Sequence, residues 1–119
     1  MARSTSTERL AGYERRYREL AEQLARIGFI SSGSVTRRYT RCGTPGCKCH
    51  ADPPQPHGPY YQWTMKVNGK TATRRLSDAE ARLHKEWIAN DRRMHHLITQ
   101  MRRVATKAGE LKIKEAADT

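Results

Sequence analysis

The sequence predicts an α+β fold, in which an N-terminal helix precedes a three-stranded antiparallel sheet with a Cys/His loop, and a long C-terminal helix follows. Two observations predict this order. Apolar residues recur every three or four positions near both ends of the chain, which is typical of helices that bury one face. The middle is rich in Val, Thr and aromatic residues and contains a strong hairpin signal. A chain of 119 residues has the usual length of one domain, so we expect a single domain over residues 1–119.

The first helix is expected over residues 5–28. Thr5 and Glu8 form a capping-box pair, in which each side chain satisfies a free backbone N–H of the first turn. Gly28 is placed to end the helix. Between them an apolar seam follows spacings of three and four, and its members are Leu10, Tyr13, Tyr17, Leu20, Leu24 and Ile27.

A β-meander is expected over residues 34–76. Asn68-Gly69 is the strongest short signal of a two-residue hairpin turn, and such a turn fixes the register of the strands on either side. One side of the ribbon then pairs Val67 with Lys70, Met65 with Ala72, Trp63 with Arg74 and Tyr61 with Leu76. The other side carries only Gln62, Thr64, Lys66, Thr71, Thr73 and Arg75. We expect the first, more apolar side to be covered by the two helices.

The last helix is expected over residues 77–116 and begins with a second capping box, Ser77 with Glu80. Its seam consists of Leu83, Trp87, Asn90, Met94, Leu97, Met101, Val104, Ala108 and Leu111. A continuous helix of this length spans about 50–60 Å, roughly twice the first helix, so part of the seam is left for a second copy or a partner protein. Asn90 in the seam favours a dimer of fixed register, or else lies where the seam is exposed. Three histidines of this helix are expected to be exposed: His84, His95 and His96.

All three cysteines lie in one loop, residues 42–57, together with His50 and His57. Thiolates and imidazoles are the ligands of tetrahedral zinc, and three cysteines cannot all pair as disulfides within one chain. Gly43, Pro45 and Gly46 allow the tight turn that such a site needs. We therefore expect a structural Zn²⁺ held by Cys42, Cys47, Cys49 and His57, with His50 as the alternative fourth ligand.

No catalytic residues are assigned. A cysteine nucleophile would need a positive neighbour and an oriented base, which Arg41, Lys48 and His57 offer. Three clustered thiols suit a metal better than one nucleophile, however, and the central region contains no paired carboxylates for acid–base chemistry. A metallothiol enzyme is the third-ranked hypothesis.

The chain is strongly basic, with a formal charge of +11 and a pI near 10.1, which indicates a polyanionic partner. Asp52 is the only acid between Glu22 and Asp78. The candidate nucleic-acid contacts are Arg37, Arg38, Arg41, Lys48, Lys66, Lys70, Arg74 and Arg75. Of these, Arg37 and Arg38 face opposite ways in a strand, and Arg74 has an inward-facing alternative. No apolar run suits a membrane span or a secretion signal, so we expect a cytoplasmic protein that does not enter the membrane.

The motif Cys42-Gly-Thr-Pro-Gly-Cys-Lys-Cys-His, followed by His57-Gly-Pro-Tyr-Tyr and Gly69-Lys70, resembles a family of small uncharacterised bacterial proteins. The resemblance covers the middle and later two-thirds of the chain. It implies a domain of unknown function, mostly actinobacterial and often encoded near transposase genes, without established catalytic residues. A looser likeness, at the level of fold alone, is to the arm-binding domains of phage-type integrases, which lay a sheet in the major groove of DNA.

These observations favour a small zinc-knuckle-like protein that binds nucleic acid, DNA ahead of RNA, as an accessory to a mobile element. The alternative is a coiled-coil interaction adaptor, in which the metal loop is only a brace and nucleic acid has no role. Charge on the sheet supports the first function, whereas an uncovered helical seam supports the second.

Overall fold

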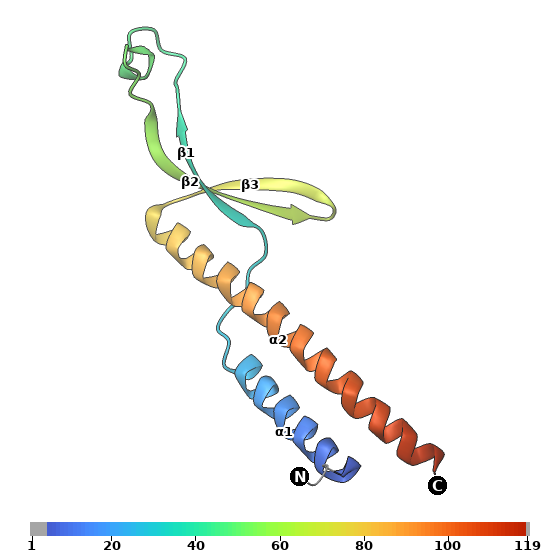
Figure 1. Ribbon diagram of the computed structural model, residues 1–119. Coiled ribbons are helices and arrows are strands. Elements are labelled where there is room, and N and C mark those ends of the chain that lie inside the picture. Colours follow the sequence, from blue (N-terminus) through green and yellow to red (C-terminus); the bar gives the residue numbers. More distant parts are fainter. Residues whose placement is uncertain (1–4, 119) are drawn as a thin grey trace. The chain divides into compact units, whose positions relative to one another are not determined.

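The computed structural model describes residues 5–118 and has the predicted α+β architecture (Figure 1). Residues 1–4 and 119 of the expected domain lie outside the described residues. The elements follow in the order α1 (Ser6–Ala25), β1 (Ser34–Thr40), the short 3-10 helix η1 (Lys48–His50), β2 (His57–Val67), β3 (Lys70–Leu76) and α2 (Asp78–Ala117). The chain forms two compact units, a helical unit up to Phe29 and from Asn90 onward, and a sheet unit over Ile30–Ala89. Helix α2 contributes its first part to the sheet unit and its remainder to the helical unit.

Both capping boxes are present as predicted. In α1 the backbone N–H of Glu8 donates to the Thr5 hydroxyl at 3.1 Å, and the Glu8 carboxylate accepts from the Thr5 N–H at 3.4 Å. Ser77 and Glu80 exchange the same two bonds at 3.1 and 3.2 Å at the start of α2. Helix α1 ends at Ala25, earlier than the residue 28 that was predicted. The N–H groups of Arg26 and Ile27 bond to carbonyls only three residues back, which tightens the helix and ends it.

The sheet has the strand order β1-β2-β3, and both strand pairs are antiparallel. Asn68 and Gly69 have φ angles of 52° and 80°, as a two-residue type I′ turn requires. The predicted hairpin register is confirmed from Tyr61 opposite Leu76 to Val67 opposite Lys70. Strand β1 extends the sheet on the other edge of β2, with Val35 opposite Trp63 and Arg38 opposite Tyr60.

One side of the sheet packs against the first turns of α2. The His84 ring lies 4.2 Å from that of Trp63 and 5.1 Å from that of Trp87, and Leu76 is buried in the same unit. The expectation that His84 is exposed was therefore wrong. Its Nδ1 is buried without a hydrogen-bond partner among the described residues. The predicted seam is also wrong at Leu83, which is 46% exposed, because the sheet contacts another stripe of the helix. His84 is the member of that stripe with the ring contact to Trp63, and Ala81 and Ile88, at helical spacing from it, are buried.

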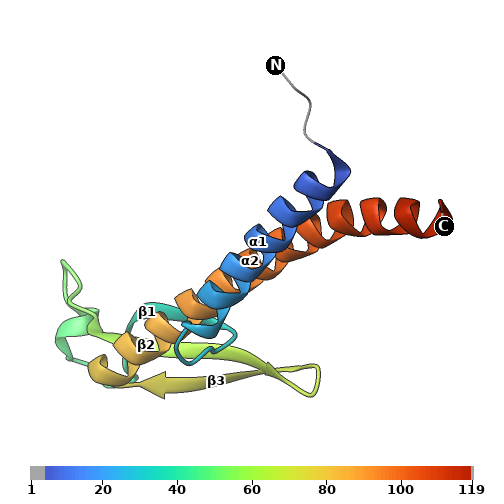
Figure 2. The same ribbon diagram turned by 90° about the horizontal axis from the view of Figure 1, so that it is seen from below.

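In the sheet unit, the first turns of α2 contact the apolar side of the sheet through His84 on Trp63 and Lys85 on Tyr61. Helix α1 belongs to the helical unit. In the helical unit α1 runs antiparallel to α2 and lies beside it (Figures 1 and 2). The core positions Leu20 and Leu97 are 0% and 3% exposed. Arg93 donates to the Gln23 side chain at 3.3 Å, and Lys112 pairs with Glu14 at 3.9 Å.

Within the described residues no helix is both long enough and apolar enough to cross a membrane.

Candidate metal centre

The ends of two paired strands position the Cys/His cluster. Cys42 follows β1, His57 is the first residue of β2, and Thr40 and His57 are paired in the sheet. Cys47 immediately precedes η1, and Cys49 lies within it. The loop of residues 41–56 therefore leaves and re-enters the sheet at neighbouring points, so its two ends hold ligands from opposite strands next to each other.

A β-bulge between Arg38 and Thr40 changes the direction of the His57 side chain. The register that pairs Arg38 with Tyr60 would place Gly58 opposite Thr40, but His57 occupies that position. The bulge depends on Gly58, whose φ is 124° and where an added Cβ would lie 2.7 Å from the Arg38 carbonyl oxygen. Bulges of this kind commonly redirect one side chain next to a functional site. Here the bulge places His57 beside the cysteines.

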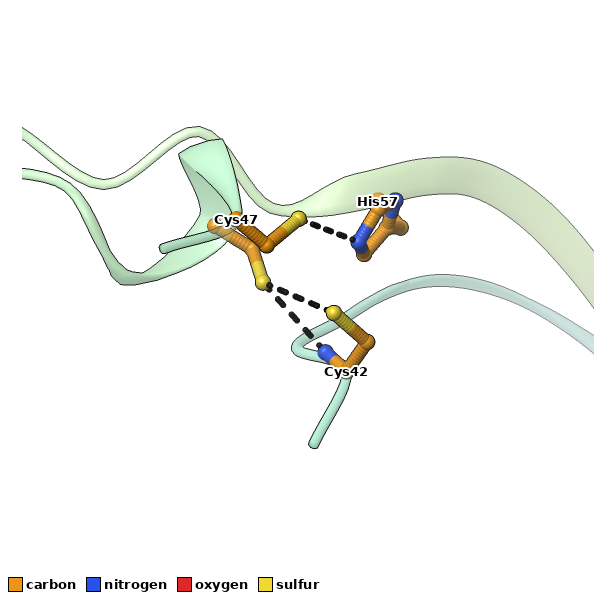
Figure 3. Close-up of side chains that lie close together, drawn as sticks. Cys42, Cys47 and His57 are labelled. Carbon is orange, nitrogen blue, oxygen red and sulfur yellow. Dashed lines mark hydrogen bonds between the residues drawn. The ribbon is translucent and has the colours of Figure 1, made fainter. Parts of the chain in front are cut away.

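Cys42, Cys47 and His57 point toward one another (Figure 3), and with Cys49 they form a group of four possible metal ligands. The three Sγ atoms and a ring nitrogen of His57 all lie within 4.8 Å of one another. Cys42 Sγ is 3.6 Å from Cys49 Sγ, and Cys47 Sγ is 3.2 Å from His57 Nε2. Zinc bonds to sulfur of about 2.3 Å place two tetrahedral sulfurs about 3.8 Å apart. The donor set and its spacing therefore fit a metal ion.

His50, the alternative ligand, lies outside this group. Its Nε2 hydrogen-bonds to the main-chain carbonyl of Cys42, an arrangement that requires the proton on Nε2. Other main-chain bonds shape the same loop, including the N–H of His50 to the Cys47 carbonyl at 2.9 Å and that of Gln55 to the Lys48 carbonyl at 3.0 Å. His50 thus supports the backbone of one ligand residue, while His57 supplies the ring nitrogen of the cluster.

The cysteines differ in their affinity for protons. A hydrogen bond from the Thr44 backbone lowers the pKa of Cys42 to about 6, and hydrogen bonds with His57, Cys47 and Cys49 act in the same direction. Burial raises the pKa of Cys49, because a thiolate is disfavoured away from water. The N–H of Cys42 also donates to Cys49 Sγ at 3.3 Å. Two thiols of one cluster are thus biased in opposite directions, and a cation beside both would favour the thiolate of each.

Four protein ligands that close a tetrahedron leave no position for a substrate, which is the arrangement of structural metal sites. Thiolate and imidazole donors suit zinc or another borderline-soft ion better than magnesium or calcium. A metal ion held in this way would connect the loop and the two strand ends.

The sheet register separates the eight candidate bases. Arg38, Lys66 and Arg75 lie on the polar side, away from the face that contacts α2. Arg37, Lys70 and Arg74 share the register positions of the opposite side, and Arg41 and Lys48 lie in the loop. All eight residues are exposed. We call the side with Arg38, Lys66 and Arg75 the polar face; it also carries Ser34, Thr36, Tyr60, Gln62, Thr64, Thr71 and Thr73.

Three of these arginines have defined neighbours. Arg75 stacks over the Tyr60 ring with 4.4 Å between its guanidinium carbon and the ring centroid. Arg37 donates to the Tyr39 hydroxyl at 2.8 Å, and Arg74 lies 3.9 Å from the Glu80 carboxylate. The sequence interpretation missed Tyr60 as a member of the polar face. Tyr60 lies two residues before Gln62 in the same strand, and side chains two residues apart in a strand share a face, so the sequence contained the signal for this placement.

The comparisons with known proteins identify the family. A model for a domain of unknown function, DUF6788, matches residues 10–85, so the chain belongs to that uncharacterised family. The match begins within α1 and ends early in α2, and it includes the whole sheet and the metal loop. Neither the comparison with curated proteins nor the comparison with solved structures found a match.

Proposed function

We propose that this protein binds nucleic acid, DNA ahead of RNA, through the polar face of its sheet, and that a structural zinc ion braces the sheet from the loop. The observation that carries the proposal is the chemistry of the polar face. It presents Arg38, Lys66 and Arg75 among Thr, Ser, Gln and Tyr side chains and bears no acid. Such side chains reach phosphates and base edges.

The surrounding charge supports this assignment. Arg41 and Lys48 lie exposed in the metal loop that joins the strands β1 and β2, next in the chain to the strand that carries Arg38. A chain with a formal charge of +11 attracts polyanions at long range, and the face that lacks acids is where a phosphate backbone meets least repulsion.

The zinc ion has a mechanical role in this proposal. Cys42, Cys47, Cys49 and His57 connect the loop to the ends of β1 and β2, and β1 contributes Arg38 to the polar face. Thiolate ligands require reducing conditions, which agrees with a cytoplasmic location. The transposase neighbourhood implied by the sequence resemblance agrees with DNA as the ligand and with a role as an accessory to a mobile element.

The proposal is tested by fluorescence anisotropy with a labelled DNA duplex over a range of salt concentrations. Affinity should fall with salt, with a log–log slope of about −0.9 for each phosphate neutralised. Replacing Arg38, Lys66 and Arg75 with Ala should weaken binding and reduce that slope. A control of equal charge replaces the exposed helical residues Arg92, Arg103 and Lys107 with Ala.

Equal losses in the two triple variants would show that net charge, rather than the polar face, determines binding. Binding that does not respond to salt would also contradict the proposal. A circular dichroism spectrum and a thermal melt of each variant separate lost contacts from lost folding.

The alternative function is a protein-interaction adaptor without a nucleic-acid role. One feature favours it: a groove of about 480 Å³ in the helical unit is lined by Tyr13, Tyr17 and Ala21 of α1 and by Val104 and Ala108 of α2, among others. Replacing Ala21 and Ala108 with Lys would disrupt an adaptor and leave nucleic-acid binding intact. The polar-face variant has the opposite expected effect, so the pair of variants distinguishes the two functions.

A further inference from the structure

We propose that the ribbon formed by β2 and β3 enters the major groove of a B-form DNA duplex, where Gln62 and Arg75 contact base edges. This inference rests on the nucleic-acid-binding function proposed above, and it specifies the kind of nucleic acid and the groove. Three properties of the ribbon carry it: the width of its free end, the side chains of its polar face, and the way in which the single aromatic residue of that face is occupied.

The ribbon is narrow at its free end. Strand β1 pairs with β2 only as far as Ser34 opposite Thr64. Beyond that point three further pairs, from Met65–Ala72 to Val67–Lys70, continue as a two-stranded hairpin that ends in the Asn68-Gly69 turn (Figure 1). The major groove of B-DNA is about 12 Å wide and admits a two-stranded ribbon, whereas the minor groove is about half as wide.

The polar face of this ribbon has side chains of suitable length. Thr64 and Thr73 face each other in the register, and Lys66 and Thr71 form the next pair on the same face. Threonine is short, so the backbone can approach the groove floor, and its methyl group can contact that of thymine. Lys66, at the narrow end, has the length to reach a phosphate.

Gln62 and Arg75 form the next cross-strand pair, on the other side of Thr64 and Thr73 from the turn, at the base of the narrow part, where Thr36 of β1 also lies opposite Gln62. Gln pairs with adenine and Arg with guanine through two hydrogen bonds each in the major groove. The Tyr60 ring supports the Arg75 guanidinium at 4.4 Å, which limits its rotation before DNA is bound. The two side chains best suited to read bases therefore lie next to each other on the ribbon.

The same face is poorly suited to single strands and to RNA duplexes. Proteins that bind single strands stack successive bases on exposed aromatic rings, whereas Tyr60 is the only aromatic residue on this face and Arg75 already covers one side of its ring. The major groove of A-form RNA is deep and narrow, so side chains of a ribbon do not reach its base edges. B-form DNA is the ligand that the ribbon fits.

The test uses the full chain and three probes of one sequence of about 20 base pairs, two helical turns: a DNA duplex, its single strand and the RNA duplex. The DNA duplex should bind most tightly at equal salt. Methyl green, which occupies the major groove, should displace the protein, and netropsin, which occupies the minor groove, should not. A single strand or RNA duplex that binds as well as the DNA duplex, or displacement by netropsin, would overturn the inference.

Two variants separate base contacts from phosphate contacts. Gln62→Ala should weaken binding to the best sequence selected from a random duplex pool by about tenfold, with the salt slope unchanged, because it removes no charge. Lys66→Ala should reduce the slope by about 0.9 and leave sequence preference intact. An unchanged sequence preference in Gln62→Ala would overturn the proposed base contact. If the wild-type chain binds none of the three probes at low salt, the proposed function itself is wrong.

Discussion

The side-chain amide of Asn90 donates a hydrogen bond of 2.8 Å to the main-chain carbonyl of Phe29. Asn90 lies in the apolar seam of α2, where a polar residue often pairs with its counterpart in a second helix and sets the register of a dimer. In this protein its partner is the segment that follows α1 in the same chain. From Asn90 toward Lys112, α2 contacts α1 through Arg93 with Gln23 and Lys112 with Glu14, whereas before Asn90 the sheet contacts His84, which lies outside the seam. Helix α1 thus contacts part of the seam, as expected, and the dimer stays a prediction.

Asn90→Asp should destabilise the helical unit by about 1 kcal/mol or more, because it removes the donor and brings a carboxylate toward the Phe29 carbonyl oxygen. A thermal melt measures the loss. Gln100→Glu is the matched control, since its hydrogen bond to His96 is exposed and lies within one helix. The molecular mass in solution should be the same for the wild type and Asn90→Asp. A change of oligomeric state with an unchanged melting temperature would instead indicate that Asn90 contacts a second copy.

The metal cluster predicts one zinc ion per chain and a melting temperature that falls on chelation. Cys47→Ser and His57→Ala should lose the ion, because each removes one of four ligands. His50→Ala should keep a stoichiometry of one but bind zinc about 10- to 100-fold more weakly, as is typical for groups that support a ligand. His96→Ala, on an exposed part of α2, is the control. Metal analysis and competition with a chromophoric chelator measure both quantities, and loss of the ion in His50→Ala but not in His57→Ala would reverse the assignment of the fourth ligand.

Gly58→Ala should weaken metal binding although it alters no ligand. Its φ of 124° disfavours any residue with a Cβ, and that Cβ would lie 2.7 Å from the Arg38 carbonyl oxygen, so the bulge that aims His57 must shift. We expect a loss of about 1–3 kcal/mol in stability together with reduced zinc affinity. Gly43→Ala is the matched control within the same loop, because its Cβ would meet no heavy atom within 4 Å. Equal zinc affinities in the two variants would show that the bulge does not position His57.

The lowered pKa of the Glu80 carboxyl predicts that the stability of the fold depends on pH. The Ser77 backbone N–H lowers the pKa of the Glu80 carboxyl, and the Ser77 hydroxyl and the nearby Arg74 add to the effect. A carboxyl whose pKa is lower in the folded chain stabilises the fold fully above its unfolded pKa, about 4.3, and loses that contribution as the pH falls through the folded value. Glu80→Gln should therefore melt below the wild type at neutral pH, and the difference should shrink in acid. Glu86→Gln, an exposed change of equal charge on the same helix, should show no such trend.

The features that the sequence predicted well are those encoded by neighbouring residues. A capping box needs two side chains three residues apart, and a type I′ turn needs two residues that tolerate positive φ. Thr5 with Glu8, Ser77 with Glu80 and Asn68-Gly69 therefore located the start of both helices and the register of one hairpin. The choice of four clustered ligands was accessible for the same reason, since all of them lie within one loop.

The features that the sequence did not determine depend on packing between distant segments. No tight turn joins β1 to β2, so the side on which Arg37 and Arg38 lie follows from pairing across the metal loop. The side of α2 that meets the sheet is the one that places His84 on Trp63, whereas Leu83 points elsewhere and is exposed. Periodicity alone does not show which of two adjacent stripes of a helix is buried, here the stripe of Leu83 or that of His84.

The two connections between neighbouring strands differ: β2 and β3 are joined by a two-residue turn, whereas β1 and β2 are joined by the metal loop. This difference affects the order of folding. Asn68-Gly69 closes the β2–β3 hairpin through backbone conformation alone, so that hairpin can form early and without metal. The connection between β1 and β2 must close the much longer segment 41–56, which costs more chain entropy; the three cysteines lie in this segment and His57 follows it. A metal ion bound by these ligands would then help to hold β1, and with it Arg38, beside the hairpin.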